Sequence, residues 1–165
     1  MLHIRIRVLA VAAFLLIGAF SMTALSQDLL TQKVISMDMA QTMAQAAVMT
    51  CRANGYRVTA TVLDNGGNIK MVLRDDGAGV GTIDLSHRKA YSAVVFRRTS
   101  GETAKAFGAM SPPPTVAGTV MLAGGVPIKV GNDTIGAIGV SGAPGGDKDE
   151  VCADAGIAKV ADKLK

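Results

Sequence analysis

The sequence predicts an α+β fold, because its helical and strand patterns come in blocks instead of alternating strictly along the chain. The order is a helix, two strands, further helices, three short strands and a final helix. Only one helical crossover joins the two groups of strands, which is too few for a doubly wound parallel sheet. We therefore expect one α+β domain that contains five strands.

The first half of the chain supplies a helix and a hairpin. Residues 29–53 repeat apolar side chains at helical spacing and end at Asn54-Gly55, where glycine favours a left-handed stop. Residues 58–63 and 69–74 alternate between apolar and polar side chains, as half-buried strands do. The sequence Asp-Asn-Gly-Gly at 64–67 is typical of a hairpin turn, so these two strands are expected to pair antiparallel.

The second half supplies the remaining elements. We expect helices at 82–98 and 102–107, strands around 119–122, 127–130 and 135–141, and a final helix at 147–164. Asp147 is positioned to cap the final helix, with Glu150 completing a capping box. Gly136 and Gly139 leave part of one face of the last strand almost without side chains, which predicts that a ligand or another backbone comes close there.

Residues 1–26 have the pattern of a secretory signal peptide. Basic residues precede an apolar run at 8–20, and Ala-Leu-Ser at 24–26 offers the small residues that a signal peptidase reads. The apolar run is shorter than the ~20 residues of a membrane span. We therefore expect cleavage before Gln27, a mature domain at 27–165, a periplasmic or secreted location and no membrane attachment after cleavage.

Composition limits the partners of the protein. The 165 residues carry a formal net charge of +4, and Arg5 and Arg7 of the predicted signal peptide contribute part of it. The chain has no Trp and only two Tyr, so the aromatic platforms on which single-stranded nucleic acids stack are missing. Nucleic acid is therefore not an expected partner.

The chain contains two cysteines, Cys51 and Cys152, and an exported protein meets conditions that permit disulfides. Each cysteine lies on the apolar stripe of its predicted helix, so both thiols are expected to face inward. A bridge between them would join the two terminal helices; two buried free thiols are the alternative. No Cys-x-x-Cys motif is present, so neither redox catalysis nor a zinc ribbon is supported.

Four segments carry a resemblance to a known family. They are RDDGAG at 74–79, SHRKAYSAVVF at 86–96, GGVPIKV at 124–130 and IGAIGVSGAPGGDKDEVCADAGI at 135–157. In their order and spacing they resemble the GlcG/HbpS-like family, over essentially the whole chain after the signal peptide. The resemblance implies a profilin-like three-layer domain, with a five-stranded antiparallel sheet flanked by helices, that assembles into homo-oligomers. Members of the family are variously described as haem-binding or haem-degrading, as corrinoid-associated, or as accessory proteins.

The resemblance implies a tetrapyrrole ligand, and haem is the first expectation, with a corrinoid or no cofactor as alternatives. His87 and Tyr91 lie one turn apart on one face of a predicted helix, and both residue types serve as proximal haem ligands. His87 is the only histidine after the signal peptide, which makes it the candidate metal ligand. An ordinary surface or interface histidine is the alternative. Met110 and Met121 are weaker candidates, because methionines usually fill cores.

Five further residues are candidates for the pocket. Arg74 and Lys89 have the charge to meet two carboxylates, such as haem propionates or a small organic acid. Alternatively, Arg74 pairs with a nearby Asp and Lys89 lies on a solvated helix face. Gly124, Gly125 and Pro127 are expected to shape the pocket wall through close backbone approach, or to form only a tight start of a strand.

These expectations combine into one hypothesis with two competitors. The first is an exported haem-binding protein whose pocket is lined by the Arg74 region, the His87 helix and residues 124–127, with any haem degradation or redox sensing driven by the cofactor. The second is an enzyme or accessory factor that acts on a small carboxylated metabolite, with Arg74 and Lys89 as clamps. The third is a structural oligomer without a ligand. No catalytic residue stands out, and the sequence leaves open whether the protein is an enzyme.

Overall fold

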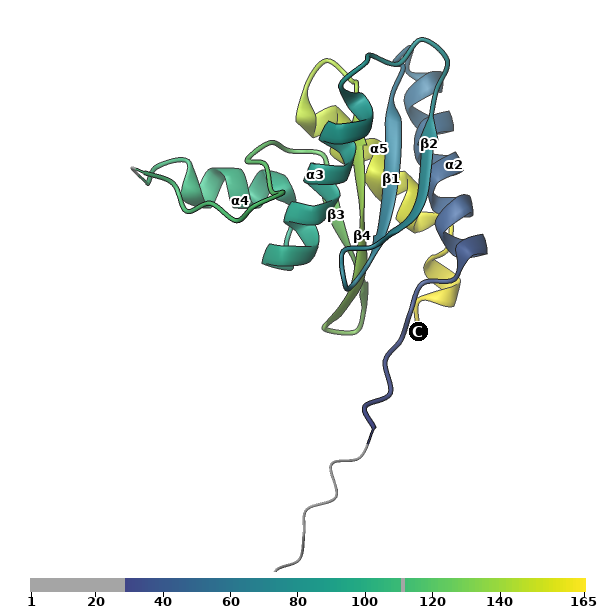
Figure 1. Ribbon diagram of the computed structural model, residues 1–165. Helices are drawn as coiled ribbons and strands as arrows, with labels where there is room; N and C mark the ends of the chain where they lie inside the picture. The colour runs from purple at the N-terminus through teal and green to yellow at the C-terminus, as the bar shows by residue number, and fades with distance from the viewer. Residues whose placement is uncertain (1–28, 111) are drawn as a thin grey trace, which may run out of the picture. The chain divides into compact units, whose positions relative to one another are not determined.

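Figure 1 shows the computed structural model of the protein, which describes residues 29–110 and 112–165. The predicted signal peptide, residues 1–26, and its cleavage point lie outside the described residues. Residues 33–165 form one compact unit, and the fold described below is the fold of that unit.

Four antiparallel strands form the sheet, in the order β2-β1-β4-β3. They are β1 (Thr59–Asp64), β2 (Ile69–Arg74), β3 (Gly125–Val130) and β4 (Asp133–Ser141). The predicted hairpin joins β1 to β2, and the Asp64 carboxylate stabilises its turn by accepting hydrogen bonds from the N–H groups of Gly66 and Asn68, each 2.9 Å long. This arrangement leaves β2 and β3 at the two edges of the sheet.

The expectation of a fifth strand at 119–122 is wrong, because this segment forms no strand in the structure. The N–H of Val120 donates to Ser92 Oγ at 2.8 Å, and Ser92 Oγ donates to the carbonyl of Val120 at 2.9 Å. A single helix side chain therefore takes both backbone groups of Val120. The apolar residues of this segment were compatible with a strand, but its backbone has no partner in the sheet.

Helices lie on both faces of the sheet, and this confirms the three-layer arrangement. α2 (Met37–Ala53) and α5 (Gly146–Ala158) cover one face, and α3 (Thr82–Phe96) covers the other (Figure 1). We call these the α2/α5 face and the α3 face. α4 (Ser100–Phe107) follows α3, and a 3-10 turn at Ala161–Lys163 follows α5.

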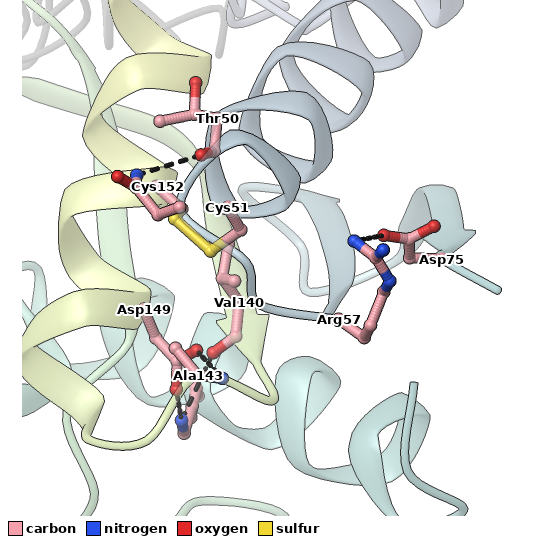
Figure 2. The surroundings of a disulfide bond; sticks show 10 residues. Thr50, Cys51, Arg57, Asp75, Val140, Ala143, Asp149 and Cys152 are labelled. Atoms are coloured by element: carbon pink, nitrogen blue, oxygen red, sulfur yellow. Dashed lines mark hydrogen bonds and ion pairs between the residues drawn. A yellow bond between two sulfur atoms is a disulfide. The ribbon is translucent and has the colours of Figure 1, made fainter. Parts of the chain in front are cut away.

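The α2/α5 face is apolar. Met43 and Ala47 of α2 belong to the same buried cluster as Val62 of β1 and Ile138 of β4. Within this cluster Cys51 and Cys152 form a disulfide that joins α2 to α5 (Figure 2). The expected bridge is thus present, and both sulfur atoms lie in the core.

The α3 face is made mostly of small and polar residues. Two pairs of hydroxyl groups join β1 to α3, at 2.7 Å between Thr59 and Thr82 and at 2.8 Å between Thr61 and Ser86. Gly139 of β4 stands opposite Gly125 of β3. A Cβ atom on either glycine would clash with a backbone carbonyl of α3, so this helix approaches the sheet where two strands carry no side chain.

The close approach at Gly139 was predicted, but its pairing with Gly136 on one face was wrong. Gly136 lies against Leu63 and Ile35, whereas Gly139 lies against Ser86 and Ala90. The two glycines are three residues apart, and successive residues of a strand point to opposite faces. The neighbour at each position is another part of the protein.

Two helices begin differently from the sequence prediction, because side-chain hydrogen bonds at their first turns differ from those expected. α2 begins at Met37 instead of residue 29, because Ser36 Oγ accepts a hydrogen bond from the N–H of Met39 at 3.2 Å. α5 has no side-chain cap, so the capping box at Asp147 and Glu150 was wrong. Glu150 instead accepts a hydrogen bond from the N–H of Gly101, at 3.0 Å, and so joins α5 to the start of α4.

Candidate functional site

The predicted site residues lie on two different sides of α3. His87 and Lys89 are two positions apart, so their side chains point about 200° apart around the helix axis. Lys89 is 3% exposed and lies on the buried side of the helix, whereas His87 is half-buried. The structure therefore does not bring these two side chains together, although the sequence-based hypothesis placed both in one pocket.

His87 and Tyr91 lie along one stripe of α3, with ring centroids 6.2 Å apart and planes 20° apart. The Tyr91 ring packs between the β1–β2 turn and a later loop, because Gly67 and Gly118 both lie against it. Tyr91 thus has a packing role, and His87 stacks beside it on the half-exposed side of the helix. Nothing in the structure assigns either residue to iron, and their role as ligands stays a prediction.

Lys89 forms a buried ion pair that the sequence did not predict. Its Nζ lies 2.6 Å from Oδ2 of Asp149 and donates to the carbonyl of Val140 at 3.2 Å. Gly124 lies against the Lys89 side chain and Gly125 lies against the Lys89 backbone carbonyl, which explains why both positions are glycines. The alternative of a solvated Lys89 is wrong.

Asp149 has two donors for its two oxygens. Oδ2 accepts from Lys89, and Oδ1 accepts from the N–H of Ala143 at 3.0 Å (Figure 2). Burial raises the pKa of Asp149 above its ordinary value, and the hydrogen bonds from Lys89 and Ala143 oppose that rise. The pair joins α3 to α5 around the end of β4.

A cleft of about 480 Å³ lies over this ion pair, where β4 leaves the sheet and leads into α5. We call it the Lys89 cleft. Its polar side chains are Lys89, Asp149, Thr82 and Ser141, and its apolar wall includes Leu85. Pro127 lies two residues beyond Gly125 along β3, and neither belongs to the lining of this cleft.

Arg74 lies at the opposite edge of the sheet from Gly124. The strand register places Arg74, Thr59 and Ser141 in one row across β2, β1 and β4. Gly124 precedes β3, so about three strand spacings, roughly 14 Å, separate it from Arg74. The structure therefore does not bring the Arg74 region and residues 124–127 together.

Arg74 donates a hydrogen bond to the carbonyl of Ala78. Within the described residues it forms no ion pair, so the alternative of an aspartate partner is wrong. Asp75 instead pairs with Arg52 of α2 and with Arg57, the latter at 3.8 Å. The hydrogen bond from Arg52 lowers the pKa of Asp75, against the opposing effect of burial, and the pKa of Arg52 is raised in turn.

A groove of about 520 Å³ lies between α2 and the edge strand β2. We call it the α2–β2 groove. Its apolar lining consists of Val48, Met49, Met71 and Leu73, and its polar lining consists of Gln41, Gln45, Arg52, Arg74 and Asp75. The two arginines lie at one end, and Gln41 lies about 16 Å away along the helix.

The sequence singled out only Arg74 among the residues of this groove. Met49, Arg52 and Met71 were missed because each looks like an ordinary helix or strand residue, and only the packing of α2 beside β2 brings them together. The charge pattern could have indicated the ion pairs of Asp75. Arg52 and Arg57 flank the end of a predicted helix, and an Asp-Asp pair lies at 75–76.

The α2–β2 groove fits the chemistry of haem. A porphyrin ring needs an apolar surface, and its propionates pair with guanidinium groups. A methionine thioether is a known axial ligand of haem iron, and Met49 and Met71 both line the groove. His87, on α3, does not line it.

No group of three or more His, Cys, Asp or Glu side chains in the described part of the chain is placed to hold a metal ion. No helix described by the structure is long and apolar enough to cross a membrane.

The fold defines a small three-layer α+β domain, and sequence comparison identifies its family. A family model described as haem degrading protein HbpS-like matches residues 35–158, so the chain belongs to the HbpS-like family. It is 33% identical over 116 residues to an uncharacterized 15.0 kDa protein from the dhaT-dhaS intergenic region of Citrobacter freundii, covering 66% of this chain and 80% of that relative. It is 31% identical over 112 residues to Protein GlcG of Escherichia coli K12, covering 67% of this chain and 84% of GlcG.

Solved structures agree with this assignment. A double mutant of HbpS from Streptomyces reticuli superposes with a TM-score of 0.75 at 37% identity, covering 79% of this chain and 89% of that chain. The PduOC:heme complex superposes with a TM-score of 0.68 over 77% of this chain and 95% of that chain. At 20% identity, this second likeness shows a shared fold.

Proposed function

We propose that this protein is exported and binds haem, and that the α2–β2 groove holds the ring. The observation that carries the proposal is the composition of the groove, which combines an apolar lining with two arginines at one end. Membership of a family described as haem degrading supports haem as the ligand. The heme complex of PduOC, a protein of the same fold, supports it further.

The two arginines differ in how they are held. Arg52 is fixed by its ion pair with Asp75, and its side chain is still 44% exposed. Arg74 is exposed and bonded only to the carbonyl of Ala78 among the described residues. Two guanidinium groups with free N–H donors at one end of an apolar groove match the two propionates at one edge of haem.

Met49 and Met71 are the candidate iron ligands in this groove. Met49 is 50% exposed and Met71 is half-buried, so both thioethers are within reach of a ligand. Haem supplies redox chemistry when bound, and this chain supplies an apolar surface and charge neutralisation. Haem degradation or redox sensing would follow from that chemistry.

A second candidate haem site is the half-exposed side of α3 at His87 and Tyr91. The stacked pair, with centroids 6.2 Å apart, is the observation that favours it. In this site His87 or Tyr91 would hold the iron. His87 lies on α3, whereas the α2–β2 groove lies between α2 and β2. The two haem sites therefore predict that different substitutions weaken binding or shift the Soret band.

A haem titration of the purified protein, followed in the Soret region, tests the proposal. The wild type is expected to show saturable binding. Arg74→Gln is expected to weaken binding roughly tenfold, because it removes a charged hydrogen bond to a propionate, with little change in the band. Met49 and Met71 are alternative iron ligands in this proposal. Either Met49→Leu or Met71→Leu is therefore expected to shift the band, because one of the two variants removes the residue that binds the iron.

The matched control is Arg88→Gln, which removes an arginine that pairs with Asp84 on the surface of α3. It is expected to leave the titration unchanged. A band shift in His87→Ala, together with normal binding by Arg74→Gln, would move the site to α3. A wild type without saturable change contradicts haem binding altogether.

Homo-oligomer formation and export also belong to the proposal. Light scattering of the purified protein measures the first, and N-terminal sequencing of exported protein measures the second. A start at Gln27 is the expected result.

A further inference from the structure

We propose that the Lys89 cleft is a second binding site, separate from the haem groove, and that it takes a small organic carboxylate. The site is independent of the proposed function, because the cleft lies at the end of β4, whereas the α2–β2 groove lies along β2.

The first observation is a free donor on a buried ammonium group. Lys89 has three N–H donors, and two are directed to Val140 and Asp149. The third has no partner among the described residues. Because Lys89 lines the cleft and is 3% exposed, a ligand that reaches this donor gains a charged hydrogen bond away from bulk water.

The second observation is a serine hydroxyl in the same wall. Ser141 is 2% exposed and lines the cleft. Its neighbours on the same face are bonded, since Thr59 pairs with Thr82 and Thr61 with Ser86. The Ser141 hydroxyl can donate a hydrogen bond to a ligand oxygen that enters the cleft.

The third observation is the start of α5 at the mouth of the cleft. Gly146, the first residue of this helix, lines the cleft. The first N–H groups of a helix have no partner within it, and they favour an anion. Lys89, Ser141 and the first residue of α5 therefore line one space.

The charges select a monoanion over a more highly charged ligand. Asp149 lies in the same wall, but each of its oxygens already accepts a hydrogen bond. Together Lys89 and Asp149 are neutral, so the cleft offers donors without a net positive charge. A dianion would meet the Asp149 carboxylate without compensation.

The apolar wall selects an organic ligand. Leu85, Leu122, Ala123 and Ala143 line the cleft beside its polar groups. An acid with a short hydrocarbon chain places its carboxylate on the donors and its chain on these residues, which inorganic phosphate cannot do.

The test is an NMR titration of the purified protein with butyrate, and with inorganic phosphate in parallel. Butyrate is expected to give saturable shifts of the Ser141, Gly142 and Gly146 amides. Ser141→Ala is expected to weaken butyrate binding roughly tenfold, because it removes a hydrogen bond to a charged group. Haem binding is read separately in the Soret band, so either site can fail alone.

The matched control is Thr134→Val, which removes a hydroxyl from the same strand, outside the cleft. It is expected to leave butyrate binding unchanged. Equal weakening by both variants, phosphate binding as tight as butyrate, or shifts confined to Arg74 and its neighbours would each overturn the proposal. So would the absence of any saturable shift with butyrate.

Discussion

The two faces of the sheet are stabilised by different physical means. On the α2/α5 face, large apolar side chains such as Met43 and Ile138 pack together and a disulfide crosses the layer. On the α3 face, the buried apolar residues are Leu63, Ala90, Ala93 and Ala137, and hydroxyl pairs and glycine contacts complete the interface. The first face depends on buried area, and the second on close fit and satisfied hydrogen bonds.

The difference shows where this fold can accommodate a ligand. An apolar layer closed by a disulfide offers a binding surface only at its border, and the α2–β2 groove lies at such a border. The α3 layer keeps polar groups under a helix, and where it ends the Lys89 cleft exposes them. Figure 2 shows the connection, since Asp149 and Cys152 lie one turn apart on α5 and tie that helix to α3 and α2 respectively.

The largest expected effect is on the disulfide of the α2/α5 face. The bridge joins residues 101 positions apart, and closing a loop of this length stabilises the fold by about 4 to 5 kcal/mol in the chain-entropy model. Replacing both Cys51 and Cys152 by Ala is expected to lower the free energy of unfolding in urea by about that amount. A reductant should destabilise the wild type and leave the variant unchanged; equal urea midpoints of oxidised wild type and variant would show that the bridge adds nothing.

The next effect concerns the close fit of the α3 face. Gly139→Ala places a Cβ atom against the carbonyl of Ser86, and such overpacking costs about 1 to 3 kcal/mol. Thermal and urea unfolding measure the loss. Gly81→Ala is the control, because a Cβ there meets nothing within 4 Å, and its expected effect is within about 0.5 kcal/mol. If the two variants are equally stable, α3 does not need the glycine contact.

The smallest effect is a pH dependence at the border of the α2/α5 face. Since Arg52 lowers the pKa of Asp75 below its ordinary value of 3.8, this carboxylate contributes stability above that value and loses it as the pH falls through its lower folded pKa. Asp75→Asn is therefore expected to be less stable near neutral pH and to lose less stability from about pH 5 to about pH 2. Asp76→Asn, at the exposed neighbouring position, is the control and should keep the wild-type slope. Parallel curves for wild type and Asp75→Asn would contradict the role of the ion pair.

The ionisation of Asp149 changes stability with pH in the opposite direction. Burial raises its pKa, so its ionised form costs the folded state stability, and that cost is absent at low pH and grows as the pH rises through the window between the ordinary and the raised value. Two carboxylates, one in each ion pair, therefore bend the stability curve in opposite directions.

Features that depend on neighbours along the chain could be predicted before the structure was known. The turn at 64–67 predicted the β1–β2 hairpin, helical periodicity placed Cys51 and Cys152 on inward stripes, and the glycines of β4 predicted a close neighbour. The family was also readable from four short segments. Each of these signals is local, because a turn, a helix stripe or a glycine contact is encoded within a few residues.

Which distant residues meet depends on how the layers of the fold pack together. Lys89 and Asp149 are 60 residues apart, and their pairing depends on α3 and α5 reaching the same end of β4. The α2–β2 groove depends in the same way on α2 lying beside β2. Residues 119–122 form no strand, because the hydroxyl of Ser92 on α3 bonds the backbone of Val120. Such contacts follow from the distances and crossing directions of packed layers, and no periodicity within a single segment carries that information.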